Sequence, residues 1–132
     1  RTARILRGIA RVVPELPRRP PAVRDAEARR QVAQADRFRT FNLRAAASAL
    51  ELIDLVEPIL PEIDVPTLIL QGSLDTVVEP ARAAWLLARL GSSHKRLVAL
   101  ERSDHLATYD HDRERLIAEA LAFLTGQAPP DA

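Results

Sequence analysis

The sequence predicts an α/β fold in which two parallel strands are packed between helices. Two short and largely apolar runs, 65–70 and 97–100, have the length of strands and lack the alternation of a half-exposed sheet. Such runs are typical of parallel strands that are covered on both faces. The segment between them is typical of a helix that begins near Pro80 and ends before Gly91. Strand, helix and strand at this spacing predict a βαβ unit with a right-handed crossover.

Residues 1–61 are predicted to be helical, rich in arginine and weakly packed. A first amphipathic helix would end at the proline-rich segment 14–21, which we interpret as a stiff connector. Asp25 can cap a second helix that runs to about Phe38, and Asn42 can cap a third helix. This composition suits a helical cap or lid segment better than a core.

Residues 62–126 are predicted to form a βαβα unit. Its last helix would begin near Asp110 or Asp112, and Gly126 can end it. Residues 127–132 would be a frayed tail.

Composition limits the classes of function. The chain has 132 residues, 47% of them hydrophobic and 28% charged, as expected for a globular protein. A net charge of +1 and arginines without interleaved aromatic residues argue against nucleic-acid binding. There is no apolar run of about 18 residues, so we expect no integral membrane contact. We recognise no signal peptide and expect a cytoplasmic location. The absence of cysteine excludes disulfides and thiolate metal sites.

Two features favour the interpretation that the chain is part of a longer protein. It begins at Arg1 and contains no methionine. Two apolar parallel strands also cannot cover both of their faces and both of their edges. We therefore expect that further strands precede Arg1, or that a second copy of the chain supplies the cover.

The most informative pair of residues follows the two predicted strands. Asp75 lies five residues beyond Leu70, and His105 lies five residues beyond Leu100. Parallel strands are about 4.8 Å apart and end at the same edge, so the two side chains can meet in the crevice where open α/β sheets bind ligands. A carboxylate that accepts from one imidazole nitrogen fixes the ring tautomer, and the other nitrogen can then take a proton from a hydroxyl group.

Each residue alone is weak evidence, since an aspartate after a glycine turn is usually a loop residue and a single histidine usually lies at the surface. Their joint pattern is more specific: Gly72-x-x-Asp75-x-x-Val78-x-Pro80 after one strand and Ser103-x-His105 after the next.

No obvious nucleophile accompanies this pair. The sequence contains no Gly-x-Ser-x-Gly motif, the sharp turn that exposes the serine of many hydrolases. Five serines lack that context and are not expected to be nucleophiles: Ser48, Ser73, Ser92, Ser93 and Ser103.

A metal site near His105, Asp110 and His111 is disfavoured, because Asp110 is better interpreted as the cap of the last helix. We expect no metal and no cofactor.

The motifs around the pair resemble those of a known family. Residues 63–75 resemble the penultimate strand and acid loop of α/β-hydrolases, and residues 103–110 resemble their histidine loop. The closest resemblance is to bacterial carboxylesterases and monoacylglycerol lipases, from about residue 36 to residue 124. It implies the C-terminal portion of an α/β-hydrolase fold, with two parallel strands, flanking helices and a helical cap segment.

The resemblance also implies roles. Asp75 would be the acid and His105 the general base of a Ser-His-Asp triad, with the serine and the oxyanion hole upstream of Arg1. The family usually has a small residue where this chain has Asp104, and we expect that carboxylate to face solvent rather than to tune His105.

The implied substrate is a small-molecule carboxylic ester. An apolar acyl pocket would be lined by Leu106, Val77, Phe38 and Phe41, although core packing is the simpler interpretation of each.

Two alternatives remain open. The chain can be a non-catalytic binding or assembly module that uses an exposed strand edge to pair with another chain. It can also belong to an α/β-hydrolase with another activity, such as a thioesterase, peptidase, lactonase or acyltransferase, or a dehalogenase-like relative with an aspartate nucleophile.

Overall fold

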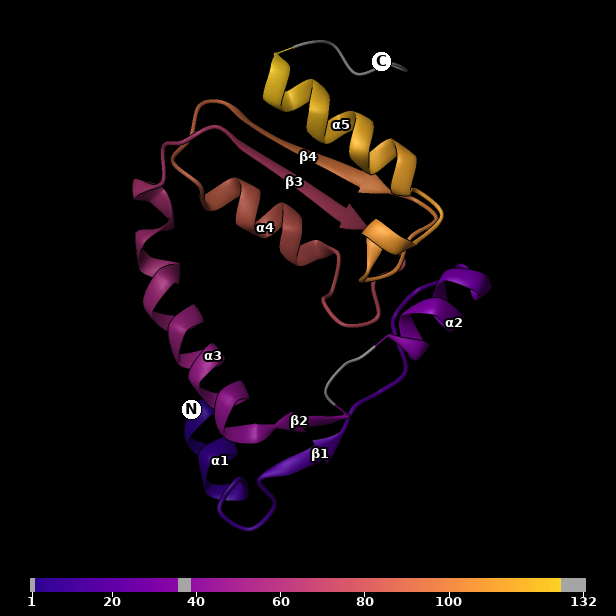
Figure 1. Cartoon of the computed structure of the whole chain (residues 1–132). Coiled ribbons are helices and arrows are strands. Elements are labelled where there is room, and N and C mark those ends of the chain that lie inside the picture. The colour runs from indigo at the N-terminus through magenta and orange to yellow at the C-terminus, as the bar shows by residue number, and fades with distance from the viewer. Residues whose placement is uncertain (1, 36–38, 127–132) are drawn as a thin grey trace. The chain divides into compact units, whose positions relative to one another are not determined.

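A computed structural model of the chain describes residues 2–35 and 39–126 (Figure 1). These residues divide into two compact units. The first unit combines Arg1–Pro20 with Asp36–Leu60, and the second combines Pro21–Ala35 with Pro61–Ala132.

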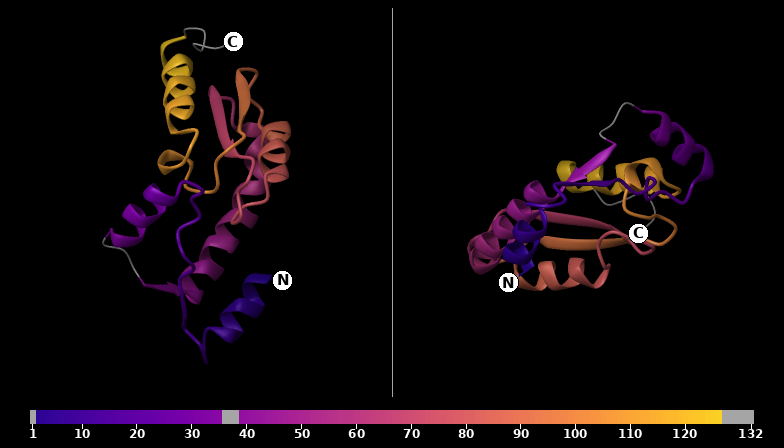
Figure 2. Two further views of the ribbon diagram at one scale, coloured as in Figure 1. Left: turned by 90° about the vertical axis from the view of Figure 1, so that its right-hand side faces the viewer. Right: turned by 90° about the horizontal axis from the view of Figure 1, so that it is seen from below.

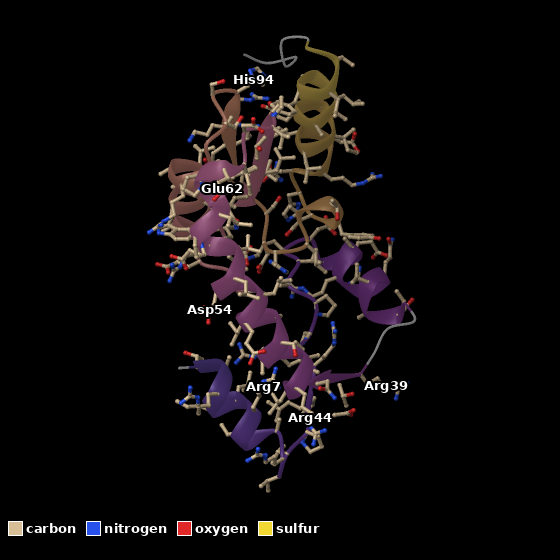
Figure 3. All side chains as sticks on the ribbon, turned by 90° about the vertical axis from the view of Figure 1, so that its left-hand side faces the viewer. Arg7, Arg39, Arg44, Asp54, Glu62 and His94 are labelled. Carbon is tan, nitrogen blue, oxygen red and sulfur yellow. The ribbon has the colours of Figure 1, made fainter. Side chains whose placement is uncertain are left out.

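The described residues of the first unit form two α-helices, a short strand pair and the start of a 3-10 helix (Glu57–Glu62). Helix α1 (Thr2–Ile9) packs against α3 (Leu43–Val56). Arg7 lies on the side of α1 that faces α3, and its Nε donates to Oε1 of Glu51 over 2.7 Å (Figure 3). Asn42 caps α3 as predicted, because its Oδ1 accepts the amides of Arg44 and Ala45 at 3.0 Å each.

The strand pair of this unit was not expected from the sequence. Strand β1 (Glu15–Pro17) pairs with β2 (Thr40–Asn42) in antiparallel register, with Leu16 opposite Phe41. The proline-rich segment is therefore half of a small ribbon rather than a simple connector. Three-residue strands carry too little periodicity to be recognised, and their pairing joins residues far apart in the sequence.

Packing in the first unit is shallow. Three of its buried apolar residues are alanines, Ala3, Ala10 and Ala47, whereas Ile5, Val12, Leu52 and Leu55 are exposed.

The second unit contains the predicted βαβ arrangement. Strands β3 (Thr67–Gly72) and β4 (Lys95–Leu100) are parallel and pair from Thr67↔Lys95 to Gly72↔Leu100. Helix α4 (Ala81–Arg89) connects them and covers one face of the pair, and α5 (Arg113–Thr125) covers the other face (Figure 2). The core consists of buried Val98, Leu100 and Ala107, together with Leu68, Leu70 and Leu116.

Helix α5 ends as predicted at Gly126, which adopts a left-handed conformation with φ of 70°. His94, just before β4, is exposed as expected, and its ring stacks on that of Phe123 in α5 with centroids 5.5 Å apart. Its place at the start of the strand is labelled in Figure 3.

Helix α2 (Ala26–Gln34) belongs to the second unit. Asp25 caps it as predicted, with Oδ1 accepting the amide of Ala28 at 2.8 Å. Leu106 donates its amide to the carbonyl of Ala22 at 3.0 Å, which ties this segment to the loop after β4. Residues 21–35 are therefore grouped with the second unit, and the division into a cap segment 1–61 and a core 62–126 stays a prediction. The hydrogen bonds that tie this segment to the second unit are long-range, and no local pattern reveals them.

Within the described residues, no helix is both long enough and apolar enough to cross a membrane.

Candidate active site

The structure brings Asp75 and His105 together. Asp75 lies in the turn after β3, and His105 lies in the turn after β4. Because Gly72 pairs with Leu100 at the ends of the two strands, both turns start at the same edge of the sheet. The Nδ1 atom of His105 lies 3.0 Å from Oδ2 of Asp75, which is hydrogen-bonding distance.

The carboxylate of Asp75 is held on both oxygens. Its Oδ1 accepts the amides of Val77 and Val78 at 2.8 Å each, and its Oδ2 accepts Nε2 of Gln71 at 2.9 Å. Burial raises the pKa of Asp75, but hydrogen bonds from Val78, His105, Val77 and Gln71 outweigh burial and hold it below its ordinary value. Asp75 is therefore a carboxylate that only accepts hydrogen bonds.

This environment determines the proton arrangement on His105. Because Oδ2 of Asp75 is an acceptor, the proton of a neutral imidazole lies on Nδ1, and Nε2 carries the lone pair. The His105 side chain is 40% exposed, whereas that of Asp75 is 4% exposed. The pair thus presents a basic nitrogen that an incoming hydroxyl group can reach.

Asp104 does not face solvent, and the expectation that it would is wrong. It is 5% exposed, and its Oδ1 accepts the Thr76 amide at 2.8 Å, the Thr76 hydroxyl at 2.9 Å and the His105 amide at 2.8 Å. Burial raises the pKa of Asp104, but these hydrogen bonds and the charge of Arg24 hold it below its ordinary value. The three donors explain why a charged side chain is buried here.

Asp110 does not cap the last helix, and the prediction that it would is wrong. Its carboxylate accepts backbone amides from Arg24, Asp25, Asp104 and His111, at 2.8–2.9 Å. The residue that precedes α5 is Asp112. Burial raises the pKa of Asp110, but the amides of Asp104, Arg24, Asp25 and His111 outweigh burial and lower it. Asp110 therefore organises the loop that carries His105.

Gly72 allows the two turns to approach each other. A Cβ atom at this position would lie 2.5 Å from the carbonyl oxygen of Ser103 and 2.6 Å from that of Asp104. Both atoms belong to the backbone and cannot move aside as a flexible side chain can. Any residue larger than glycine would therefore displace the histidine loop.

The serines are placed as follows. Ser103 is fully buried, and its Oγ donates to Oδ2 of Asp112 over 2.9 Å and accepts the Asp112 amide at 3.1 Å. Ser92 is also buried and donates to the carbonyl of His94. Ser48 and Ser93 are exposed, and Ser73 is half-buried. Buried and internally bonded hydroxyls such as that of Ser103 cannot reach a substrate.

The four residues expected to line a pocket lie in different places. Val77 and Leu106 belong to the turns that carry Asp75 and His105; Val77 is 62% exposed and Leu106 is half-buried. Phe41 is 45% exposed on β2, in the first unit. Phe38 lies outside the described residues. For Val77 and Phe41, this exposure argues against core packing in the described part of the chain.

No group of three or more His, Cys, Asp or Glu side chains is arranged to hold a metal ion among residues 2–35 and 39–126. His111 instead lies with its Nδ1 3.5 Å from Oδ2 of Asp25.

Sequence reasoning missed the structural roles of the buried carboxylates and of Gly72. Asp104, Asp110 and Asp112 lie close together in the sequence around His105, and this cluster of acidic residues in a short loop could have indicated that they organise the loop. Their acceptor roles depend on amides from segments up to 86 residues away.

Comparison with known proteins identifies the family. The family model described as serine aminopeptidase, S33 (Hydrolase_4) matches residues 2–112. The chain belongs to this family. The predicted resemblance to α/β-hydrolases of the monoacylglycerol lipase type is thereby confirmed.

Individual relatives agree with this assignment. The chain is 33% identical over 85 residues to a thermostable monoacylglycerol lipase from Bacillus sp. (strain H-257), an alignment that covers 62% of this chain and 34% of that protein. A structure from work on the metagenome-derived lipolytic enzymes LipS and LipT matches 86% of this chain and 44% of its own length, with a TM-score of 0.76 and 27% identity.

The monoacylglycerol lipase of Paleococcus ferrophilus matches 96% of this chain and 52% of its own, with a TM-score of 0.81 and 16% identity. At that identity the likeness shows the α/β-hydrolase fold alone. The chain thus spans about a third of the curated relative and about half of these two solved structures.

Proposed function

We propose that these residues form part of a carboxylic ester hydrolase of the carboxylesterase or monoacylglycerol lipase type. Asp75 would be the acid and His105 the general base of a Ser-His-Asp triad. The observation that carries the proposal is the 3.0 Å contact of His105 Nδ1 with Asp75 Oδ2 beyond the ends of two adjacent parallel strands. The serine and the oxyanion hole would be supplied by sequence that precedes Arg1, since no Gly-x-Ser-x-Gly motif occurs in these residues.

The geometry suits a two-step acyl transfer. As the serine oxygen attacks the ester carbonyl, Nε2 of His105 takes the hydroxyl proton, and Asp75 stabilises the imidazolium through Nδ1. When the carbon–oxygen bond of the leaving alcohol breaks, Nε2 returns that proton to the alcohol. Water then attacks the acyl-enzyme with the same proton transfers in the same order, which releases the acid and restores the serine.

The substrate proposal is an ester of an acyl chain with a small alcohol. It is supported by the names of the relatives, which are lipases. Val77 and Leu106 follow the acid and the base and would contact the acyl chain. We further propose that residues 1–61 supply a helical cap segment, as their arginine-rich and weakly packed sequence predicts.

Peptide bonds are a second candidate substrate, favoured by the description of the matching family as serine aminopeptidases. The same acid and base serve ester and amide hydrolysis, because both pass through a tetrahedral intermediate. The two candidates are separated by the leaving group, which is an alcohol in one case and an amine in the other.

The test compares the 132-residue chain with the protein encoded by the complete reading frame. Each is assayed with p-nitrophenyl butyrate, a monoacylglycerol and an aminoacyl p-nitroanilide. We expect the chain alone to hydrolyse none of the three, and the complete protein to hydrolyse the two esters. His105→Ala should abolish that activity and His94→Ala, which changes an exposed histidine outside the site, should leave it intact.

Three results would count against the proposal. Ester hydrolysis by the chain alone that His105→Ala removes would mean that a nucleophile within these residues had been overlooked. Faster hydrolysis of the anilide than of the esters would favour the peptidase. A complete protein with no turnover, and no reaction with a serine-directed fluorophosphonate, would favour a binding module.

A further inference from the structure

Asp104 joins the two turns that carry Asp75 and His105. All three of its strong contacts use one oxygen, Oδ1, which accepts the Thr76 amide, the Thr76 hydroxyl and the His105 amide at 2.8–2.9 Å. Thr76 directly follows Asp75 in the sequence. A single buried oxygen therefore holds the residue next to the acid and the base itself.

We propose that Asp104 is a positioning residue that keeps the imidazole of His105 and the carboxylate of Asp75 in hydrogen-bonding register. Its effect on the hydrogen bond follows from these contacts, and its effect on turnover rests on the function proposed above. Asp104 would act entirely through Asp75 and His105 and would not touch the substrate.

The orientation of the imidazole depends on both turns. The backbone of His105 belongs to the turn after β4, and its Nδ1 lies 3.0 Å from Oδ2 of Asp75 in the turn after β3. This contact depends on how the turn after β3 is set against the turn after β4, and Asp104 connects these two turns directly.

The backbone of Asp104 is itself held in place. Its amide donates to Oδ2 of Asp110 at 2.8 Å, and Gly72 packs against its carbonyl oxygen. The carboxylate thus extends from a fixed point of the histidine loop toward the acid turn. Together with the backbone hydrogen bond from the Leu74 amide to the Ser103 carbonyl at 3.1 Å, the Asp104 side chain sets the separation between the turns.

The two oxygens of Asp104 differ in how many hydrogen bonds they accept, and a substitution that replaces only one of them can test the proposal. The contact found for Oδ2 is with Nε of Arg24 at 3.4 Å, and the Arg24 side chain is 44% exposed. A half-exposed ion pair of that length contributes little. Asparagine keeps an acceptor oxygen in the position of Oδ1 but carries no charge, so we expect Asp104→Asn to retain the bridge between the turns.

The first experiment measures the tautomer of His105 in the 132-residue chain by nitrogen-15 NMR of labelled histidine, at a pH where the ring is neutral. Wild-type chain should show the proton on Nδ1. Asp104→Ala and the milder Asp104→Ser remove the bridge and should give a mixture of the Nδ1–H and Nε2–H forms. Asp104→Asn should retain the wild-type tautomer, as should the matched control Asp64→Ala, which changes an exposed aspartate of the same unit.

The result that would overturn the proposal is a wild-type tautomer in a folded Asp104→Ala or Asp104→Ser chain. Loss of the Nδ1–H form in Asp104→Asn would also overturn it, because the charge and not the acceptor oxygen would then be responsible. Asparagine preserves the buried hydrogen bonds, so this arm remains informative if the two smaller residues prevent folding.

The second experiment uses the complete protein. Asp104→Ala should lower kcat by about 10²-fold, the order expected for a misplacement of about 1 Å, with KM unchanged. Asp104→Asn should restore kcat. Ester hydrolysis that is unaffected by Asp104→Ala would refute the positioning role and leave the hydrolase proposal standing. Absence of hydrolysis in the wild-type protein would refute the hydrolase proposal, and the tautomer measurement would still decide the role of Asp104.

Discussion

Oδ2 of Asp110 accepts the backbone amide of Asp104 at 2.8 Å and also accepts the amide of Arg24 at 2.8 Å. Its other oxygen, Oδ1, accepts two further amides, those of Asp25 and His111. The histidine loop is therefore built around a buried carboxylate whose two oxygens are both fully used. Asp104, one residue before His105, accepts its hydrogen bonds through Oδ1 alone. Replacement by asparagine should therefore affect Asp104 and Asp110 differently.

Asp110→Asn should destabilise the chain, whereas Asp104→Asn should be tolerated. In the Asp110→Asn variant the side-chain NH₂ group would point toward two backbone N–H groups, so two buried donors would lose their acceptor, at about 1–3 kcal/mol each. Urea unfolding of both variants measures the difference, with Asp64→Asn as the exposed control. Equal urea midpoints for the Asp110 and Asp104 variants would show that the pattern of acceptors does not govern stability.

Stability should fall in acid. Hydrogen bonds hold the pKa of Asp75, Asp104 and Asp110 below the ordinary value of 3.8, so at low pH the unfolded chain binds more protons than the folded chain. The stabilisation is complete above the unfolded pKa and is lost as pH falls from about 4 through the lowered folded values. Urea midpoints between pH 6 and pH 2.5 measure this slope, and Asp110→Asn should make it shallower. A midpoint independent of pH below 4 would contradict the roles assigned to these carboxylates.

Gly72→Ala should separate the two turns. The added methyl group would meet the backbone oxygens of Ser103 and Asp104, and overpacking of this kind typically costs about 1–3 kcal/mol. We expect a lower thermal midpoint and loss of the Nδ1–H tautomer of His105. Gly8→Ala is the matched control, because a Cβ there meets no atom within 4 Å and alanine favours the helix. If Gly72→Ala leaves both measurements unchanged, the close approach of the turns is not required.

Asp75→Asn should remove most of the activity of the complete protein without unfolding it. An asparagine oxygen can still accept the Val77 and Val78 amides, and Gln71 Nε2, which loses its acceptor on residue 75, still donates to the Gly72 carbonyl at 3.1 Å. The asparagine NH₂ group would donate to His105 Nδ1 and place the imidazole proton on Nε2. In serine proteases the analogous change lowers kcat about 10⁴-fold. Steady-state kinetics with p-nitrophenyl butyrate provide the measurement. A loss of less than about tenfold would argue against Asp75 as the triad acid.

Ser103→Ala should impair stability and leave the nucleophile untouched. The Ser103 hydroxyl is buried and bonded to Asp112, so its removal leaves buried partners unsatisfied, at about 1–3 kcal/mol. Fluorophosphonate labelling of the complete protein should persist in this variant. Labelling that disappears while the protein remains folded would identify Ser103 as the reactive serine and overturn its assignment as a structural residue.

Local signals in the sequence predicted most of the regular elements. Asn42 and Asp25 cap the helices that they were expected to cap, because an N-cap depends on amides only two or three residues away. The two apolar runs predicted where β3 and β4 lie and that they pair in parallel, since strands buried on both faces are apolar throughout. The pairing of β1 with β2 was not predicted, because the paired residues are far apart in the sequence.

By itself, the sequence determined the α/β fold, the family and the two residues that follow equivalent ends of adjacent strands. Strand periodicity and motif spacing carry that information, and the register of β3 and β4 turns it into a contact between Asp75 and His105. Only the tertiary structure decided what holds the pair in place. Asp104 is buried rather than solvent-facing, and Asp110 joins a loop to a segment 86 residues away rather than capping a helix. The donors that bind these carboxylates are mainly backbone amides. Every residue except proline has such an amide, so the sequence does not indicate which of them the fold brings to a given carboxylate.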